Sequence, residues 1–192
     1  MLREFIKRVI EFIVKFILKI VFRLEVKGLD KIPNEGPLLI LSNHHSYLDP
    51  PAIIVSFPRE IHFVAKKELF ENFFTKFFVN MWDCIPVDRE TPKPSTFKKI
   101  FKYLEEGKAV AIFPEGTRVK NPEQFGKAQE GVNYILSKTK VPVLLLKIEG
   151  TYQWYKKFKI TINIKDIISQ EEISKMSDTN LADFLMKKIY EN

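Results

Sequence analysis

The sequence predicts an α/β fold: a single domain with a mixed central sheet flanked by helices, preceded by an amphipathic helix at the amino terminus. Short apolar runs alternate with stretches of helical spacing, which is the pattern of α/β domains. The 192 residues are enough for one compact domain, and no Gly/Ser-rich or acidic stretch in the interior indicates a flexible joint. We therefore place the amphipathic helix in residues 1–25 and the domain in residues 26–192.

The first 25 residues carry apolar side chains at helical spacing. They are Phe5, Ile6, Val9, Ile10, Phe12, Ile13, Phe16, Ile17, Ile20, Val21 and Leu24. The polar side holds Glu11, Lys15, Lys19 and Arg23, with Lys7 and Arg8 continuing its basic character. A bilayer-spanning helix needs about 20 largely uncharged residues, whereas charges interrupt this segment every third or fourth position. We expect neither a spanning helix nor a cleaved signal peptide, which would need an uninterrupted apolar core and a small-residue cleavage site.

A wide apolar face beside a narrow basic stripe predicts a helix that lies in the headgroup layer of an anionic membrane. Packing against the core, or a dimer contact, is the alternative for the same pattern. The single cysteine, Cys84, excludes an internal disulfide and favours a reducing compartment, so we expect a monotopic protein on the cytoplasmic face of a membrane. Cys84 begins a short apolar run and is interpreted as a small core residue.

Five apolar runs are predicted to be strands, at residues 38–42, 61–65, 84–87, 109–113 and 141–148. Residues 158–165 alternate between apolar and polar side chains, which predicts a half-buried strand near the end. The predicted helices lie at residues 51–57, 68–82, 96–106, 127–139 and 180–190. In such sheets ligands bind where strands end and the following loops open, so chemically active residues are sought there.

The formal net charge of +7 indicates an anionic partner, which can be nucleic acid, an anionic membrane or a phosphorylated substrate. Nucleic-acid binding would need a reading helix or an aromatic-and-basic strand motif, and we find neither, so no nucleic-acid partner is expected. Phenylalanine occurs 17 times and is concentrated in the first 25 residues and in residues 70–82. The second group can border an acyl-chain slot, seat the protein on a bilayer or pack in the core, and core packing is the simplest account.

The first polar motif, residues 43–50, directly follows a predicted strand and reads Asn-His-His-Ser-Tyr-Leu-Asp-Pro. On a continuous helix His44 and Asp49 would point about 140° apart, so only a turn can pair them. Once paired, the carboxylate fixes the imidazole tautomer and leaves the other nitrogen free to take a proton from a hydroxyl. An ordinary helix start at Asp49 and Pro50 is the alternative. No Cys or Glu at ligand spacing joins His44 and His45, so we expect no metal.

The second polar motif, Phe-Pro-Glu-Gly-Thr-Arg at residues 113–118, begins as another predicted strand ends. Gly116 permits close backbone approach to an anion, Thr117 offers a hydroxyl, and Arg118 can hold a phosphate through two parallel hydrogen bonds. The alternative is a plain turn with Pro114 second and Gly116 fourth. Transfer to an alcohol that carries a phosphate requires a general base and an anion-binding site. The His–Asp pair and the motif at residues 113–118 would supply these at two strand ends.

With these motifs the sequence resembles the lysophospholipid acyltransferases of the 1-acylglycerol-3-phosphate O-acyltransferase type, over residues 26–151. The family's Asn-His-x-Ser-x-x-Asp block is filled by Asn43, His44, Ser46 and Asp49, and its Phe-Pro-Glu-Gly-Thr-Arg block is complete at residues 113–118. The block that ends in Asp-Arg corresponds to residues 83–89, with Asp83 where the family has Gly. The Ala-Lys-x-Glu-Leu segment is residues 65–69, and the block Val-Pro-Val-x-Pro-Val is residues 141–146, with Leu145 in place of the second Pro.

The resemblance implies an enzyme that forms no acyl-enzyme and needs no cofactor. His44 would take the proton of the acceptor hydroxyl as that hydroxyl attacks an acyl thioester, and Asp49 would orient the ring. The residues that would bind the acceptor phosphate or shape its seat are Lys66, Arg89, Glu115, Gly116, Thr117 and Arg118. Lys67 lies next to Lys66, so the position of the lysine is open between these two residues.

The implied reaction moves a fatty acyl group from acyl-ACP or acyl-CoA to the sn-2 hydroxyl of 1-acylglycerol 3-phosphate, a lysophosphatidic acid, and makes phosphatidic acid at an anionic membrane surface. The motifs do not choose between the two donors. Glycerol 3-phosphate or another lysolipid is an alternative acceptor. Two other classes stay open: a non-catalytic membrane lipid-binding module, and a thioesterase that uses the same pair to activate water.

Overall fold

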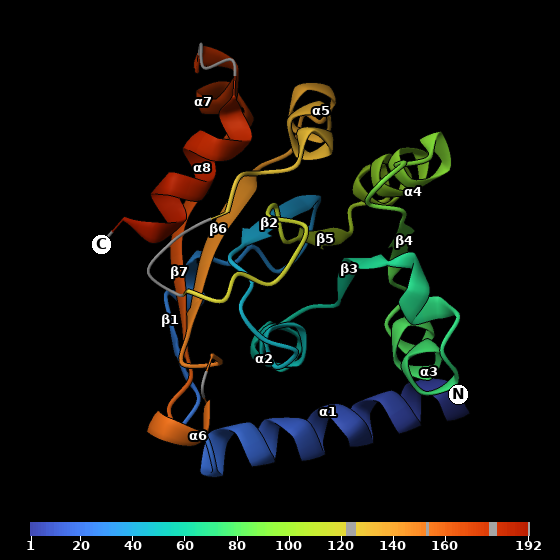
Figure 1. The fold of residues 1–192 in the computed structure, drawn as a ribbon, viewed down its shortest axis with the longest axis vertical. Helices are drawn as coiled ribbons and strands as arrows, with labels where there is room; N and C mark the ends of the chain where they lie inside the picture. The colour runs from blue at the N-terminus through green and yellow to red at the C-terminus, as the bar shows by residue number, and fades with distance from the viewer. Residues whose placement is uncertain (122–125, 153, 177–179, 192) are drawn as a thin grey trace.

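The computed structural model describes residues 1–121, 126–152, 154–176 and 180–191. Within them, seven strands form one sheet in the order β1-β7-β6-β2-β5-β3-β4, with helices on both faces (Figure 1). The strands are β1 (Glu25–Lys27), β2 (Leu38–Ser42), β3 (Ile61–Lys66), β4 (Ile85–Val87), β5 (Ala109–Ile112), β6 (Val143–Glu149) and β7 (Thr161–Ile168). The pairs from β4 to β6 are parallel and β7 runs antiparallel to β6, so the sheet is mixed as predicted.

The helices cover the two faces of the sheet and one end of the molecule (Figure 1). They are α1 (Leu2–Ile20), α2 (Asp49–Ser56), α3 (Phe73–Met81), α4 (Pro94–Glu105), α5 (Glu130–Lys138), α6 (Trp154–Lys157), α7 (Gln170–Lys175) and α8 (Leu181–Tyr190), with short 3-10 turns η1 (Leu29–Lys31) and η2 (Lys67–Phe70). The predicted α/β class, with its amphipathic first helix, is confirmed.

The central strand β2 explains how the sheet buries its core. Its residues Leu38 to Leu41 have no exposed surface, as expected of a parallel strand covered on both faces. Leu38 and Ile40 pack with residues of α1, α2 and α3. Leu39 and Leu41 pack with residues of α4, α5 and α8. Because β5 runs parallel beside β2, the loops that follow these two strands leave the sheet at the same edge.

The single helix predicted for residues 68–82 is wrong. The chain forms η2 and α3 instead, and Asn72 separates them by accepting hydrogen bonds from the backbone of Phe74 and Thr75 at 3.0 and 3.3 Å. Core packing of the phenylalanine stripe is also wrong, because four of these rings are exposed while the buried residues of α3 are Val79 and Met81. The exposed rings are Phe73, Phe74, Phe77 and Phe78.

The helix α1 lies across one end of the molecule and presents its apolar face outward (Figure 1). Phe5, Phe12 and Phe16 are 66%, 70% and 57% exposed, whereas Leu18 is buried in the core beside α2. Two charged residues that the sequence assigned to its polar side face the protein: Lys7 is buried and pairs with Glu60, and Glu11 accepts a hydrogen bond from Trp82 Nε1 at 2.9 Å.

Arg3 adds a third polar contact between α1 and the rest of the domain, through an ion pair with Asp83 at 2.8 Å. Arg8, Lys15 and Lys19 remain exposed on α1. Among the described residues, no helix is both long enough and apolar enough to cross a bilayer.

Candidate active site

His44 and Asp49 are paired by the loop between β2 and α2. His44 Nδ1 lies 2.8 Å from Asp49 Oδ2, and the same oxygen accepts the backbone N–H groups of His45 and Ser46, each at 2.7 Å. Asp49 is fully buried, and its N–H donates to the Ser46 carbonyl at 3.2 Å, which closes the turn that the spacing of the pair requires. Because the carboxylate accepts, Nδ1 carries the hydrogen, and Nε2 is the nitrogen that can take a proton when the ring is neutral.

The His44 ring is held from a second side by aromatic stacking. It lies against Phe113 with ring centroids 4.0 Å apart and planes inclined by 14°, and Phe113 in turn stacks on Phe63 at 5.6 Å. The ring is therefore fixed by the Asp49 carboxylate at its edge and by Phe113 at its face. His44 as a residue is 8% exposed.

The motif at residues 113–118 forms a turn at the end of β5. The Gly116 N–H donates to the Phe113 carbonyl at 3.0 Å, so the chain does turn here with Pro114 second and Gly116 fourth, which leaves an anion-binding role of the same residues open to test. Gly116 has a φ of +66°, and a Cβ on it would lie 2.8 Å from the Gln129 side chain. This position therefore suits glycine and little else.

The two predicted loops meet at one edge of the sheet. The Val119 N–H donates to the His44 carbonyl at 2.8 Å, and His45 Nδ1 donates to the Val119 carbonyl at 2.9 Å. Arg118, which precedes Val119 and is exposed, places its guanidinium over the ring of Tyr47. His44 and Arg118 are 74 positions apart in sequence and are brought to adjacent loops by the parallel pairing of β2 and β5.

The other predicted phosphate-binding residues lie at the ends of neighbouring strands. Partial burial of the guanidinium lowers the pKa of Arg89, and the positive charge of Arg118 adds to that effect, so the two cations share one region. Lys66 ends β3 and pairs with Glu68 at 3.2 Å, whereas Lys67 pairs with Asp88 at 2.5 Å. Thr117 is exposed in the turn beside Arg118.

Glu115, which is expected to help shape the phosphate seat, lies in the protein interior. It is 2% exposed, and its carboxylate accepts from the His44 N–H at 3.0 Å, the Gly126 N–H at 3.2 Å and the Tyr190 hydroxyl at 3.1 Å. Burial raises the pKa of Glu115, and these three donors oppose that effect. The carboxylate is therefore held by three donors inside the protein, and it joins the loop of His44 to Tyr190.

Tyr190 is the contact that sequence reasoning missed. It ends α8, 75 residues beyond Glu115 in the chain, and its hydroxyl also lies 3.2 Å from His45 Nε2. The sequence around Tyr190 reads as the apolar face of a closing helix, and no local pattern distinguishes this tyrosine from a core residue.

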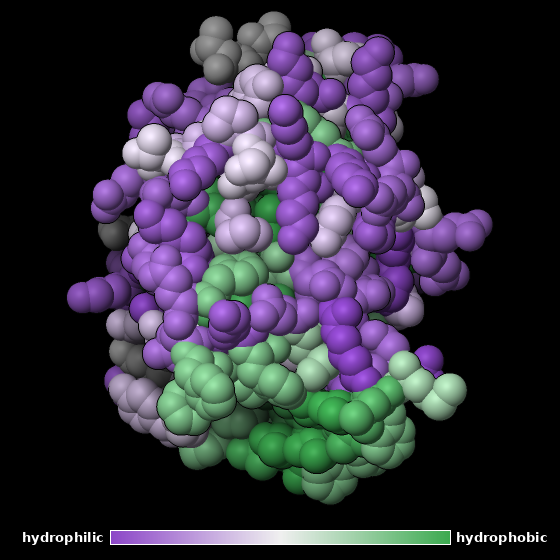
Figure 2. Space-filling view, turned by 90° about the vertical axis from the view of Figure 1, so that its right-hand side faces the viewer, coloured by the Kyte–Doolittle hydropathy of each residue, from purple (hydrophilic) through white to green (hydrophobic). Residues whose placement is uncertain are grey.

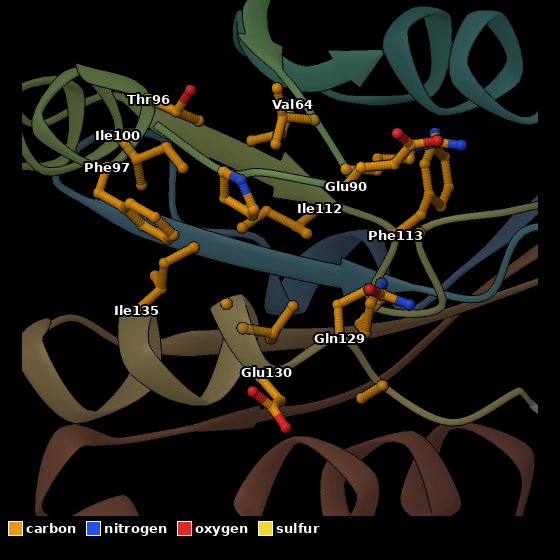
Figure 3. A pocket seen from close by; sticks show the side chains of 18 of the residues that line it. Val64, Glu90, Thr96, Phe97, Ile100, Ile112, Phe113, Gln129, Glu130 and Ile135 are labelled. Carbon is orange, nitrogen blue, oxygen red and sulfur yellow. The ribbon is translucent and has the colours of Figure 1, made fainter. Parts of the chain in front are cut away.

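A cavity of about 450 Å³ opens beside this edge, between the sheet and the helices α4 and α5 (Figure 3). Its apolar lining includes Val64, Phe97, Ile100, Ile112, Val132 and Ile135. Phe113 and Gln129 lie towards one end and Phe97 and Ile100 towards the other. Phe113 contacts both the cavity and His44. Within the described structure the residues that line the cavity include none from α3, so an acyl-chain slot along that helix finds no support here.

Among the residues that the structure describes, no group of three or more His, Cys, Asp or Glu side chains could hold a metal ion.

Comparisons with known proteins complete the description of the site. Residues 23–148 match the family model described as Acyltransferase. The chain is 30% identical over 155 residues to the 1-acyl-sn-glycerol-3-phosphate acyltransferase of Bacillus subtilis (strain 168), with 79% of this chain and 76% of that protein covered. It is 29% identical over 133 residues to the chloroplastic 1-acyl-sn-glycerol-3-phosphate acyltransferase BAT2 of Brassica napus, with 68% of this chain covered but only 38% of that protein.

Among solved structures, the fold is similar to the crystal structure of the 1-acyl-sn-glycerophosphate (LPA) acyltransferase from Thermotoga maritima, with a TM-score of 0.77. The match covers 98% of this chain and 78% of that one at 23% identity, so it speaks for the fold alone.

Proposed function

The chain belongs to the acyltransferase family, and from that premise we propose that it transfers a fatty acyl group from an acyl thioester to the sn-2 hydroxyl of 1-acylglycerol 3-phosphate, making phosphatidic acid. The observation that carries the proposal is the 2.8 Å contact of His44 Nδ1 with the buried Asp49 carboxylate, on the loop beside Arg118. In this proposal the base His44 and the cation Arg118 act on one acceptor. The names of the relatives support the same acceptor.

In the proposed reaction His44 acts as the general base. Its Nε2 takes the proton of the acceptor hydroxyl as the oxygen attacks the thioester carbonyl, and the imidazolium is stabilised by Asp49. When the tetrahedral intermediate collapses, the carbon–sulfur bond breaks, and His44 returns the proton to the leaving thiolate. The ester and a free thiol are the products, and no protein side chain is acylated.

The acceptor phosphate is proposed to bind Arg118 and Arg89, with Thr117, the Gly116 backbone and Lys66 around it. The guanidinium of Arg118 lies over the Tyr47 ring, which occupies one face of the cation and leaves its N–H edge for a phosphate. We prefer Lys66 to Lys67 because its ion pair is the longer one. Lys66 pairs with the exposed Glu68 at 3.2 Å, whereas Lys67 pairs with Asp88 at 2.5 Å. Glu115 contributes by holding the turn in place, because its buried carboxylate accepts hydrogen bonds from the surrounding segments.

The cavity beside Phe113 is the place we propose for an acyl chain. Much of its lining is apolar, and its charged or polar lining residues are Arg89, Glu90, Thr96, Lys127, Gln129 and Glu130. Phe113 lines the cavity and stacks on the His44 ring, so an acyl chain bound there would have one end close to His44. The donor is acyl-ACP or acyl-CoA, and both are acidic partners for a chain of net charge +7.

We also propose that residues 1–25 associate with the anionic cytoplasmic face of a membrane while residues 26–192 form the acyltransferase domain. The exposed apolar side chains of α1, α3 and the α6 region support this. Figure 2 shows apolar residues gathered at one end of the molecule, which is the end that holds α1 and α3 in Figure 1. They are Leu2, Phe5, Val9, Phe12, Ile13, Phe16, Ile17, Ile20, Phe73, Phe74, Phe77, Phe78, Trp154, Tyr155 and Phe158. Arg8, Lys15 and Lys19 beside them suit anionic headgroups.

The test is a radiolabelled acyl-transfer assay with the purified chain on anionic vesicles. Acyl-ACP and acyl-CoA are each combined with lysophosphatidic acid, with glycerol 3-phosphate and with no acceptor. We expect label in phosphatidic acid only where lysophosphatidic acid is present. Release of free fatty acid without acceptor would instead identify a thioesterase, and vesicle binding without any transfer would identify a lipid-binding module.

A further inference from the structure

Tyr190 reaches the catalytic edge from a part of the chain that the family match does not include. The match ends at residue 148, and Tyr190 is the last residue of α8. This helix is anchored by Leu185, Met186 and Ile189, which are fully buried against the face of the sheet that also carries α4 and α5. The phenol is therefore held in place by a packed helix, and its hydroxyl can act as a fixed point for the loops above it.

Among the partners of the Tyr190 hydroxyl are two groups that each hold the loop of the base. Glu115 Oε1 lies 3.1 Å away, and Oε2 of the same carboxylate accepts the backbone N–H of His44 at 3.0 Å. His45 Nε2 lies 3.2 Å away, and the backbone N–H of His45 donates to Asp49 Oδ2 at 2.7 Å. The hydroxyl is thus connected to His44 through Glu115 and to Asp49 through His45.

The hydrogen-bond roles in this cluster follow from its acceptors. The Val119 carbonyl can only accept, so His45 Nδ1 carries a hydrogen. In the neutral imidazole Nε2 is then an acceptor, and the single hydrogen of the phenol is shared between Nε2 and Glu115. In the protonated imidazole Nε2–H donates to the phenol oxygen, and the phenol donates to Glu115, so every group has a partner. Without the hydroxyl, Glu115 and His45 would each lose a partner in a largely buried place.

We propose that Tyr190 is a positioning residue for the reaction: its hydroxyl fixes Glu115 and His45, and through them the backbone that sets the distance and angle of the His44–Asp49 pair. Tyr190 touches neither substrate nor the reacting atoms. The inference rests on the proposed role of His44 as the base. Because Tyr190 reaches the backbone of His44 through Glu115 and touches none of the phosphate-binding side chains itself, loss of the hydroxyl lowers kcat by a larger factor than it raises the KM of the acceptor.

Two substitutions separate the hydroxyl from the ring. Tyr190→Ala removes both and lowers the melting temperature as well as kcat, whereas Tyr190→Phe keeps the ring packing and removes only the hydrogen bonds. We expect the phenylalanine variant to melt within a few degrees of the parent protein while its kcat stays about tenfold low, the size of effect that an unsatisfied buried partner produces. Tyr103→Phe, a hydroxyl deletion near the far end of α4, is the matched control and keeps full kcat.

A measurement that needs no activity follows the loop itself. Hydrogen–deuterium exchange of the peptide covering residues 43–49 is expected to quicken in Tyr190→Phe and not in Tyr103→Phe, because the His44 N–H donates to the carboxylate that loses its partner. Full kcat in Tyr190→Phe, or rescue of both stability and kcat by phenylalanine relative to alanine, would overturn the inference. Absence of acyl transfer by the parent chain would defeat the proposed function instead, and the exchange data would still decide whether Tyr190 orders the loop.

Discussion

The guanidinium carbon of Arg118 lies 3.7 Å from the ring centroid of Tyr47, a ring that is 71% exposed at the edge of the candidate site. An exposed cation–π contact is worth about 0.5–1 kcal/mol. We predict that Tyr47→Ala raises the KM of the acceptor about two- to fivefold with kcat unchanged. Tyr47→Phe keeps the aromatic face and should match the parent protein. Equal KM values in all three proteins would show that the contact does not prepare Arg118 for its ligand.

His44→Ala removes the proposed base and should lower kcat by at least about a hundredfold. Asp49→Asn leaves the geometry of the loop available but presents a different partner to Nδ1, so it should also lose most activity. Both variants are measured by acyl transfer, with circular dichroism melting and vesicle binding as controls for fold and docking. Retention of more than about a tenth of the parent activity in His44→Ala would remove this residue from the role of base.

Gly116→Ala should weaken both the fold and the activity. The substitution forces a side chain into the left-handed region, which costs about 1–2 kcal/mol, and places its Cβ 2.8 Å from Gln129 Cγ. Gly36→Ala is the matched control, since Gly36 has a φ of +83° and nothing within 4 Å of the added carbon. We expect a similar loss of stability from backbone strain in both variants, measured by chemical denaturation, and a loss of acyl transfer only at position 116.

Cys84 should react slowly with thiol reagents in the folded protein. Burial raises the pKa of its thiol from an ordinary 9.0 to about 11, so the thiolate fraction at pH 8 falls about a hundredfold. The sign is that of an acid whose charged form is disfavoured by burial, and the labelling rate should therefore keep rising with pH up to about 11. Labelling with a disulfide reagent at pH 8, with and without denaturant, measures the ratio. Equal rates in both conditions would place Cys84 outside the core.

Charges on the outward face of α1 should reduce binding to anionic vesicles. Phe12 and Phe16 are 70% and 57% exposed there, and the transfer of each ring out of water is worth enough that Phe12→Glu or Phe16→Glu should weaken vesicle binding at least about tenfold. Tyr134→Glu on α5, a 46% exposed aromatic at the opposite end of the molecule, is the control (Figure 1). Co-sedimentation at low salt gives the comparison, and failure of the parent chain to sediment would refute the docking proposal.

The parts of the fold that were predictable are those with a local cause. Central parallel strands are buried on both faces, so β2 and β5 appear in the sequence as unbroken apolar runs. The pairing of His44 with Asp49 was predictable because a polar loop directly after a strand turns, and a turn is what brings these two positions together. The roles of the individual site residues remain predictions that the assays above address.

Other features lack a local signal. Periodicity locates an apolar stripe but does not tell which neighbour covers it, so the exposure of Phe73 and Phe74 could not be read from their spacing. Asn72 fits a helical pattern as an exposed polar residue and only the structure reveals it as a cap. The strand β1 has three residues, too few for an alternation to appear. Tyr190 meets Glu115 through packing of α8 on the sheet, which no sequence window contains.

The polar contacts on the inner side of α1 have a practical consequence. Arg3 is tied to Asp83, Lys7 to Glu60 and Glu11 to Trp82, while Leu18 and Phe22 complete the core over α2. A chain shortened to begin after this helix would uncover that core and leave Glu60 without its cation, so deletion would yield an aggregating protein instead of a more soluble catalyst. Because these contacts hold α1 rigidly on the domain, the candidate active site keeps one height and one tilt relative to any surface on which the helix lies.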